Sequence, residues 1–153
     1  MTGAIRVAPA DPSAPGPAAL LAQRDLLMAS LFAPEDSHTL DAEELARDNV
    51  RFLAADDGAA TVGIGALALR EGYGEVKSMF TVPAARGRGV ADAILSALIG
   101  LARAEGRPLL RLETGTGLDA AHRLYARHGF TPRGPFGDYA ESPASLFFER
   151  RLE

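Results

Sequence analysis

Apolar positions recur along this chain with two different spacings. In the first half, compact apolar runs at 50–55, 60–69 and 75–82 have the length and residue types of β-strands. Asp56-Asp57-Gly58 separates the first two runs, and Asp-Gly supplies the positive φ that a hairpin turn needs. The pattern therefore predicts a hairpin followed by a third strand.

Further along, the spacing changes to every third or fourth residue, which is typical of helices. Val90, Ile94, Leu98 and Leu101 predict a helix that Gly106 ends. A strand is expected next at 109–114, and then a helix at 118–128 that Gly129 closes. Two last strands are expected at 130–132 and 144–150.

In the N-terminal third, the residue pattern predicts more helix than strand. A first strand is expected at 4–8, and a proline-rich loop leads to a helix at 18–31 whose apolar stripe comprises Leu20, Leu21, Leu27 and Leu31. Asp41 followed by Glu44 has the spacing of a capping box, which predicts a second, short helix.

Together these elements predict a mixed α/β (α+β) fold. The length of 153 residues, 47% of them apolar, suits one domain spanning 1–153. A formal net charge of -4 provides no basic field for nucleic acid. The longest apolar run, at 62–69, is far shorter than a membrane span, so we expect no membrane association.

Cysteine is absent from the sequence, which excludes disulfides, thiolate metal sites and a thiol nucleophile. The N-terminus also lacks the apolar core of a signal peptide. We therefore expect a cytoplasmic protein. His38 lies near acidic residues without a metal-ligand spacing, so no metal is expected.

The most informative segment is Arg86-Gly87-Arg88-Gly89-Val90-Ala91, a glycine turn between a strand and a helix. Glycines let a ligand approach the backbone closely, and the helix N-terminus offers unpaired N–H groups to an anion. Gly63–Ala68 also matches a dinucleotide fingerprint, but no helix can follow it before Gly72. The turn lacks the Gly-Lys-Ser/Thr ending of a P-loop as well, which disfavours ATP chemistry.

This turn resembles the R/Q-x-x-G-x-G/A motif of the GNAT family of N-acetyltransferases. Downstream, the segment from Ala121 to Phe130 is similar to the family's second signature, A-x-x-L-Y-x-x-x-G-F. The resemblance implies a GNAT fold: a mixed sheet of about six or seven strands with splayed middle strands, flanked by about four helices.

The resemblance also implies acetyl-CoA as the acetyl donor. Backbone N–H groups of the turn would bind its pyrophosphate, and the edge of the preceding strand would pair with its pantetheine amides. The implied cofactor-binding residues are Met79, Phe80, Thr81, Arg86, Gly87, Arg88, Gly89, Val90, Ala91 and Asp92. Leu118 departs from the pattern of many family members, which have an asparagine there that hydrogen-bonds CoA.

Tyr125 matches the family tyrosine that protonates the departing thiolate, and a phenol is a competent donor for that step. Taken alone, Tyr125 is better explained as an amphipathic aromatic residue packing one helix face. An oxyanion would be held by a strand N–H near Phe80.

An amine with a lysine-like pKa is protonated at neutral pH, so a base must remove a proton before the attack. Two carboxylates match glutamates that do this in some family members. These candidates are Glu75 and Glu113. The alternative is that they form ion pairs with Lys77 and Arg111, respectively. Tyr139, in the aromatic loop 134–139, is a candidate substrate contact or part of an ordinary turn.

The expected reaction is direct acetyl transfer to a primary amine of a small molecule, with no acyl-enzyme. Acetylation of protein N-termini or lysines remains an alternative, as does an idle acyl-CoA-binding sensor domain. The sequence leaves the acceptor amine and the oligomeric state open, a homodimer included.

Overall fold

The computed structural model describes residues 3–152, and over this range the chain folds around one seven-stranded sheet. The strand order is β1-β2-β3-β4-β5-β7-β6. All neighbours are antiparallel except β4 and β5. The strands are β1 (Arg6–Pro9), β2 (Val50–Asp56), β3 (Thr61–Arg70), β4 (Tyr73–Thr81), β5 (Leu109–Gly115), β6 (Thr131–Arg133) and β7 (Ser145–Arg151).

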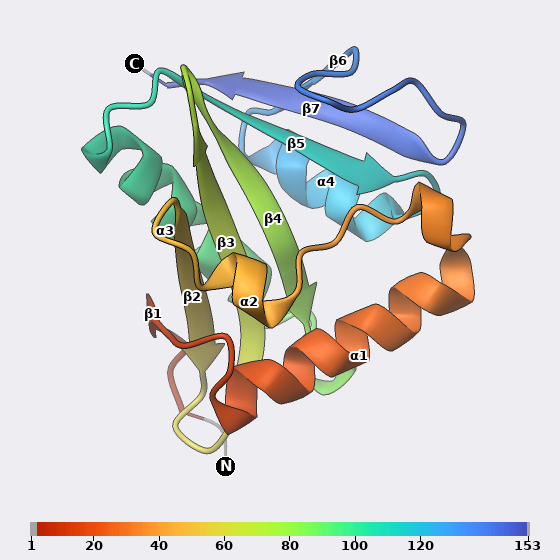
Figure 1. Ribbon diagram of the computed structural model, residues 1–153. Coiled ribbons are helices and arrows are strands. Elements are labelled where there is room, and N and C mark those ends of the chain that lie inside the picture. The colour runs from red at the N-terminus through yellow and green to blue at the C-terminus, as the bar shows by residue number, and fades with distance from the viewer. Residues whose placement is uncertain (1–2, 153) are drawn as a thin grey trace.

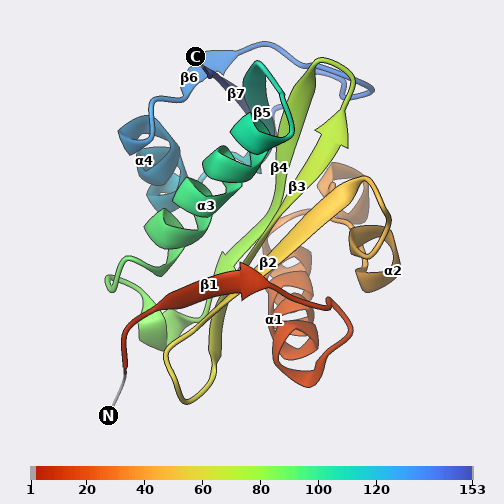
Figure 2. The same ribbon diagram turned by 90° about the vertical axis from the view of Figure 1, so that its left-hand side faces the viewer.

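Helices cover both faces of this sheet. On one face lie α3 (Val90–Ala104) and α4 (Asp119–Arg127), and on the other lie α1 (Pro15–Leu31) and α2 (Ala42–Leu45), as Figure 2 shows edge-on. Two short 3-10 turns, at Pro34–Asp36 and Pro83–Ala85, complete the described elements. The expected fold, a mixed sheet of about six or seven strands with about four helices, is confirmed.

Two hydrophobic cores follow from this layering. The larger core joins α3 and α4 to the sheet and includes Leu67, Leu95 and Leu98. The smaller core packs Leu20, Leu21 and Leu45 against Phe52 and Ile64 on the opposite face. Burial of these side chains against both faces holds the sheet between its helices.

Local sequence signals explain where several elements begin. The helix α1 starts at Pro15, three residues earlier than expected, because proline suits the first turn, where its missing N–H is not needed. Asp41 and Glu44 form the predicted capping box, with hydrogen bonds of 2.8 and 3.1 Å.

The apolar stripe expected on α1 is only partly correct. Leu20 and Leu21 are buried, but Leu31 is 51% exposed, whereas the charged Arg24 is 4% exposed. In Figure 1 the C-terminal half of α1 extends beyond the sheet. Leu27 and Leu31, on this half of the helix, line a cleft instead of a core.

Candidate active site

A cleft opens where the two parallel strands separate. Register pairing between β4 and β5 covers only Gly74 with Leu110 and Glu75 with Arg111. Beyond these pairs a cleft of about 860 Å³ is lined by α1, β4, β5, α4 and the start of α3. The predicted splay of the middle strands therefore creates the cavity.

A bulge in β4 lies beside this separation. Opposite β3, Ile64 pairs with Phe80 and Ala66 with Lys77, so β4 carries one extra residue. Ser78 within it has φ of 59°, which is unusual for a residue other than glycine. A bulge bends its strand and redirects the following residues. Met79, Phe80 and Thr81 then line the cleft, as predicted for an edge that pairs with a ligand.

The glycine turn forms the other wall at the N-terminus of α3. Gly87 and Gly89 have φ of 80° and 78°, and a Cβ built on either would meet no heavy atom within 4 Å. Backbone N–H groups of residues 87–92 donate to no backbone carbonyl in the described chain, whereas Ala93 N–H donates to Gly89 O. The turn therefore has the open N–H groups that an anion cradle needs.

Of the ten predicted cofactor-binding residues, nine line the cleft and Arg88 does not. Arg88 instead lies 3.6 Å from the Asp57 carboxylate. Asp57 anchors the β2–β3 turn by accepting from the N–H groups of Ala59 and Ala60, and these hydrogen bonds lower its pKa. Arg88 is thus turned toward that loop.

The one carboxylate at the cradle is compensated by α4. His128 Nε2 lies 2.8 Å from Asp92 Oδ1, and Arg127 Nη2 lies 3.1 Å from Asp92 Oδ2. The hydrogen bond with His128, followed by the contact with Arg127, lowers the pKa of Asp92. This pairing weakens the repulsion that the carboxylate would exert on a bound phosphate.

Tyr125 lies in α4, is 6% exposed and lines the cleft. Its hydroxyl has no hydrogen-bond partner among residues 3–152, and no fully buried side-chain oxygen there lacks one. The hydroxyl must therefore retain access to the cleft. Burial, reinforced by the nearby charge of Glu113, raises the pKa of Tyr125, so the group stays protonated as a donor.

The two candidate bases differ in their access to the cleft. Glu113 lines it and accepts a hydrogen bond from Ser145 Oγ at 2.7 Å. Its expected alternative partner, Arg111, pairs instead with Glu149 at 2.8 Å.

Glu75 is 3% exposed and is not among the cleft-lining residues. Its carboxylate accepts hydrogen bonds from Arg70 at 3.2 Å and from Tyr139 at 2.5 Å. Lys77 Nζ lies 3.5 Å away, so the alternative ion pair predicted for Glu75 is present. Tyr139 does not line the cleft either, and its hydrogen bond connects Glu75 to the C-terminal loop.

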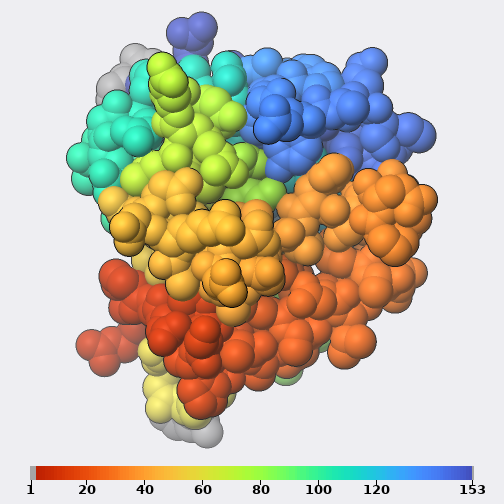
Figure 3. All heavy atoms as spheres, in the orientation of Figure 1, coloured from red at the N-terminus to blue at the C-terminus, as the bar shows by residue number. Residues whose placement is uncertain are grey.

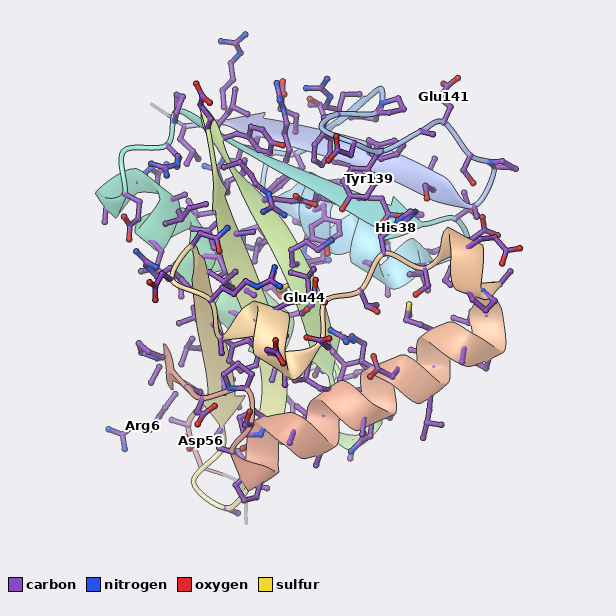
Figure 4. The ribbon with its side chains drawn as sticks, in the orientation of Figure 1. Arg6, His38, Glu44, Asp56, Tyr139 and Glu141 are labelled. Atoms are coloured by element: carbon purple, nitrogen blue, oxygen red, sulfur yellow. The ribbon has the colours of Figure 1, made fainter. Side chains whose placement is uncertain are left out.

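Two further residues lie beside this network. Lys77 Nζ donates to His38 O at 2.8 Å and to the Tyr139 hydroxyl at 2.9 Å. The His38 ring meets that of Tyr139 edge-on, with centroids 5.1 Å apart, and Figure 4 shows the two next to each other. The exposed surface shows the same junction, where orange atoms of the segment after α1 meet blue C-terminal atoms (Figure 3).

Sequence reasoning did not place Arg24, Lys77 or His38 at the site. A charged residue within the apolar face of α1 was the available signal for Arg24. His122 is partly buried, with Nε2 2.9 Å from Gly115 O. Among the described residues, no three His, Cys, Asp or Glu side chains form a group that could hold a metal ion.

Comparison with known proteins decides the family. The model of the acetyltransferase (GNAT) family matches residues 20–130, most of the chain. The chain belongs to the GNAT family. The resemblance noted in the two motifs is therefore confirmed, and the protein is an acetyltransferase.

Curated relatives match most of the chain. "IAA acetyltransferase" of Azospirillum brasilense is 42% identical over 135 residues, covering 87% of this chain and 88% of that protein. YedL of Escherichia coli (strain K12), an N-acetyltransferase described as uncharacterized, is 43% identical over 122 residues, covering 78% and 77%.

Solved structures share the GNAT fold. A Klebsiella pneumoniae protein described as an acyl-CoA N-acyltransferase is 32% identical, with a TM-score of 0.85 over 97% of this chain and 98% of that one. The PaiA N-acetyltransferase of Thermoplasma acidophilum, solved with coenzyme A, is 13% identical, with a TM-score of 0.71 over 97% and 99%. Within the described part of this GNAT protein, no helix has the length and apolarity to span a membrane.

Proposed function

We propose that this protein transfers an acetyl group from acetyl-CoA directly to the primary amine of a small molecule. The observation that carries the proposal is the course of one cleft. It begins at the glycine turn, passes the free edge of β4 and Tyr125, and reaches Glu113. A donor at one end and an amine at the other would therefore meet where the strands separate.

The donor end has the features that acetyl-CoA requires. The unpaired N–H groups of residues 87–92 suit the two phosphates of the pyrophosphate. The edge of β4 from Met79 to Thr81 offers backbone groups to the pantetheine amides, in the manner of an added strand. The PaiA protein, with the same fold, was solved with coenzyme A.

In the proposed reaction, the amine nitrogen attacks the thioester carbonyl carbon, forming a C–N bond as the C–S bond breaks. An N–H of the β4 edge holds the developing oxyanion. The Tyr125 hydroxyl gives its proton to the departing thiolate. The ammonium loses one proton to a base before the attack and a second proton to solvent after it. The base and Tyr125 then exchange protons with solvent, which leaves one proton released per turnover. Because the amine attacks the thioester itself, no acyl-enzyme is needed.

We assign the first proton removal to Glu113 rather than to Glu75. Glu113 lines the cleft, whereas Glu75 is buried and holds Arg70, Tyr139 and Lys77. A general base must reach the proton that it abstracts, directly or through one water molecule. Glu75 supports the site from behind the cleft wall.

A small acceptor is favoured because the acceptor end is covered. The contact of His38 with Tyr139 joins the segment after α1 to the C-terminal loop. Lys77 fastens the same junction by donating to both residues. A peptide substrate would need an open groove across this region.

The proposal is tested by measuring thiol release from acetyl-CoA with a panel of small amines and, in parallel, with peptides carrying a free N-terminus or lysine. We expect release with small amines and formation of the N-acetyl product by mass spectrometry. Faster acetylation of peptides, or binding of acetyl-CoA with no transfer to any amine, would contradict the proposal.

The base is tested with Glu113→Gln. We expect kcat/KM to fall about 10²-fold at neutral pH and to recover as the pH approaches the pKa of the amine. Glu149→Gln is the matched control, since Glu149 lies on the adjacent β7 and pairs with Arg111 outside the cleft. Equal losses in the two variants would rule out Glu113 as the base.

A further inference from the structure

Two buried cations stand at the acceptor end of the cleft. Arg24 is 4% exposed, Lys77 is 9% exposed, and both line the cavity. Lys77 Nζ donates to His38 O at 2.8 Å, and Arg24 Nη2 donates to Leu40 O at 2.9 Å. Arg24 Nη1 also donates to Oγ of Ser78, the neighbour of Lys77 in β4. Residues 38–40 and β4 therefore contribute to the surroundings of both cations.

Each cation keeps one N–H group without a partner. Lys77 has three N–H groups and gives two, to His38 O and the Tyr139 hydroxyl, while Glu75 Oε2 at 3.5 Å is beyond good hydrogen-bond distance. Arg24 has five and gives four, two of them to Asp25. Among residues 3–152, the remaining Nζ–H and Nη1–H make no hydrogen bond.

Charges of both signs surround these groups. Arg24 and Lys77 line the cleft together with Asp36 and Glu113, while Asp25 and Glu75 lie beside the two cations. The side chain of Asp25 is 59% exposed, so solvent weakens its compensation of Arg24. Arg24 is therefore the less compensated of the two buried cations.

We infer that the acceptor amine carries a carboxylate, as an amino acid does, and that Arg24 and Lys77 bind it. This inference rests on the proposed function. Two free N–H groups match the two oxygens of a carboxylate, whereas a phosphate would present three oxygens and a greater charge. Glu113 then meets the ammonium end of the same molecule. The apolar part of the acceptor lies against Leu27, Met28, Leu31 and Phe32, which line the α1 side.

The test uses pairs of acceptors that differ only in the carboxylate: phenylalanine with phenethylamine, leucine with 3-methylbutylamine, and alanine with ethylamine. We expect kcat/KM to be about tenfold or more higher for the amino acid in the pair whose side chain fits best. If every amine is acetylated as efficiently as its amino acid, the inference is wrong.

Variants then locate the preference. Replacing Lys77 alone would remove a cation that compensates the buried Glu75 carboxylate. The double variant Glu75→Gln, Lys77→Met is therefore compared with Glu75→Gln alone. In the double variant and in Arg24→Met, we expect the ratio of the two kcat/KM values to fall toward one. Arg70→Gln is the control, because Arg70 contacts Glu75 but does not line the cleft, and it should keep the ratio.

A binding measurement separates this inference from the proposed function. The probe is 3-phenylpropanoate, which is phenylalanine without its amine, and its binding is followed by titration calorimetry. We expect binding that Arg24→Met weakens about tenfold, whether or not any acetyl transfer is detected. No transfer with probe binding would refute the proposed function alone. Equal binding of the probe to wild type and Arg24→Met would refute the carboxylate site.

Discussion

The Tyr139 hydroxyl donates a hydrogen bond to Glu75 Oε2 at 2.5 Å, across 64 residues of sequence. The same hydroxyl accepts a hydrogen bond from Lys77. Burial and the adjacent Glu75 carboxylate raise the pKa of Tyr139, so it remains a donor at neutral pH. A residue of the C-terminal loop therefore completes the group that holds Lys77 at the cleft.

Tyr139→Phe should lower both stability and acceptor binding. The change removes one donor from buried Glu75 and one acceptor from Lys77, and we expect the free energy of unfolding to fall by about 1–3 kcal/mol. Urea denaturation measures this loss, and steady-state kinetics should show a higher KM for the acceptor. Tyr73→Phe is the control, because Tyr73 packs on Phe136 in the same aromatic group and has no hydroxyl hydrogen bond within residues 3–152. Equal effects of the two changes would contradict the role of Tyr139.

Tyr125→Phe should reduce turnover without loss of stability. Its hydroxyl has no partner within residues 3–152, so we expect kcat to fall about 10²-fold while the Kd of CoA, measured by calorimetry, stays the same. Because burial raises the pKa of Tyr125 above its usual 10.0, the wild-type enzyme should lose no activity through deprotonation of this acid below pH 10.0. Unchanged turnover in Tyr125→Phe would exclude it as the acid.

Gly89→Val should weaken CoA binding more than it weakens the fold. A side chain there must adopt φ near 78° and would project into the cradle, where no protein atom now lies within 4 Å. We expect an increase in the Kd of CoA of about tenfold or more, since the change blocks close approach of the phosphates. Gly72→Val, at φ of 83° with equally open surroundings but outside the cleft, imposes the same kind of backbone strain. A similar Kd in both variants would mean that the turn does not bind CoA.

Asp92→Asn should alter stability only where Asp92 is ionised. The folded-state pKa of Asp92 lies below its usual 3.8, mainly because of His128. The pairing therefore stabilises the fold fully above pH 3.8, and this contribution disappears as the pH falls through the lowered pKa. Urea denaturation from pH 7 down to pH 2 should show the wild type more stable than the variant at neutral pH, with the difference closing in acid. A difference that persists at pH 2 would point to packing rather than to charge.

Much of the fold was predictable because its signals are local. Apolar spacing distinguishes the strand at 60–69 from the helix that starts at Val90, and the Asp-Gly turn and the capping box at Asp41 mark boundaries. The exposed end of α1 was not predictable. Leu31 satisfies the helical period, but only the position of the helix relative to the sheet decides whether that side chain meets a core or a cleft.

The sequence by itself determined the GNAT fold, the glycine turn with its open N–H groups, and the place of Tyr125 in the second signature. These depend on backbone geometry and on residues close together in the chain. Tertiary structure decided the acceptor half: it buried Glu75, left Glu113 facing the cleft, turned Arg88 toward Asp57, and joined Arg24 and Lys77 through residues 38–40. Such outcomes depend on which distant segments supply the hydrogen-bond partners of a buried charge, and sequence spacing does not specify those partners.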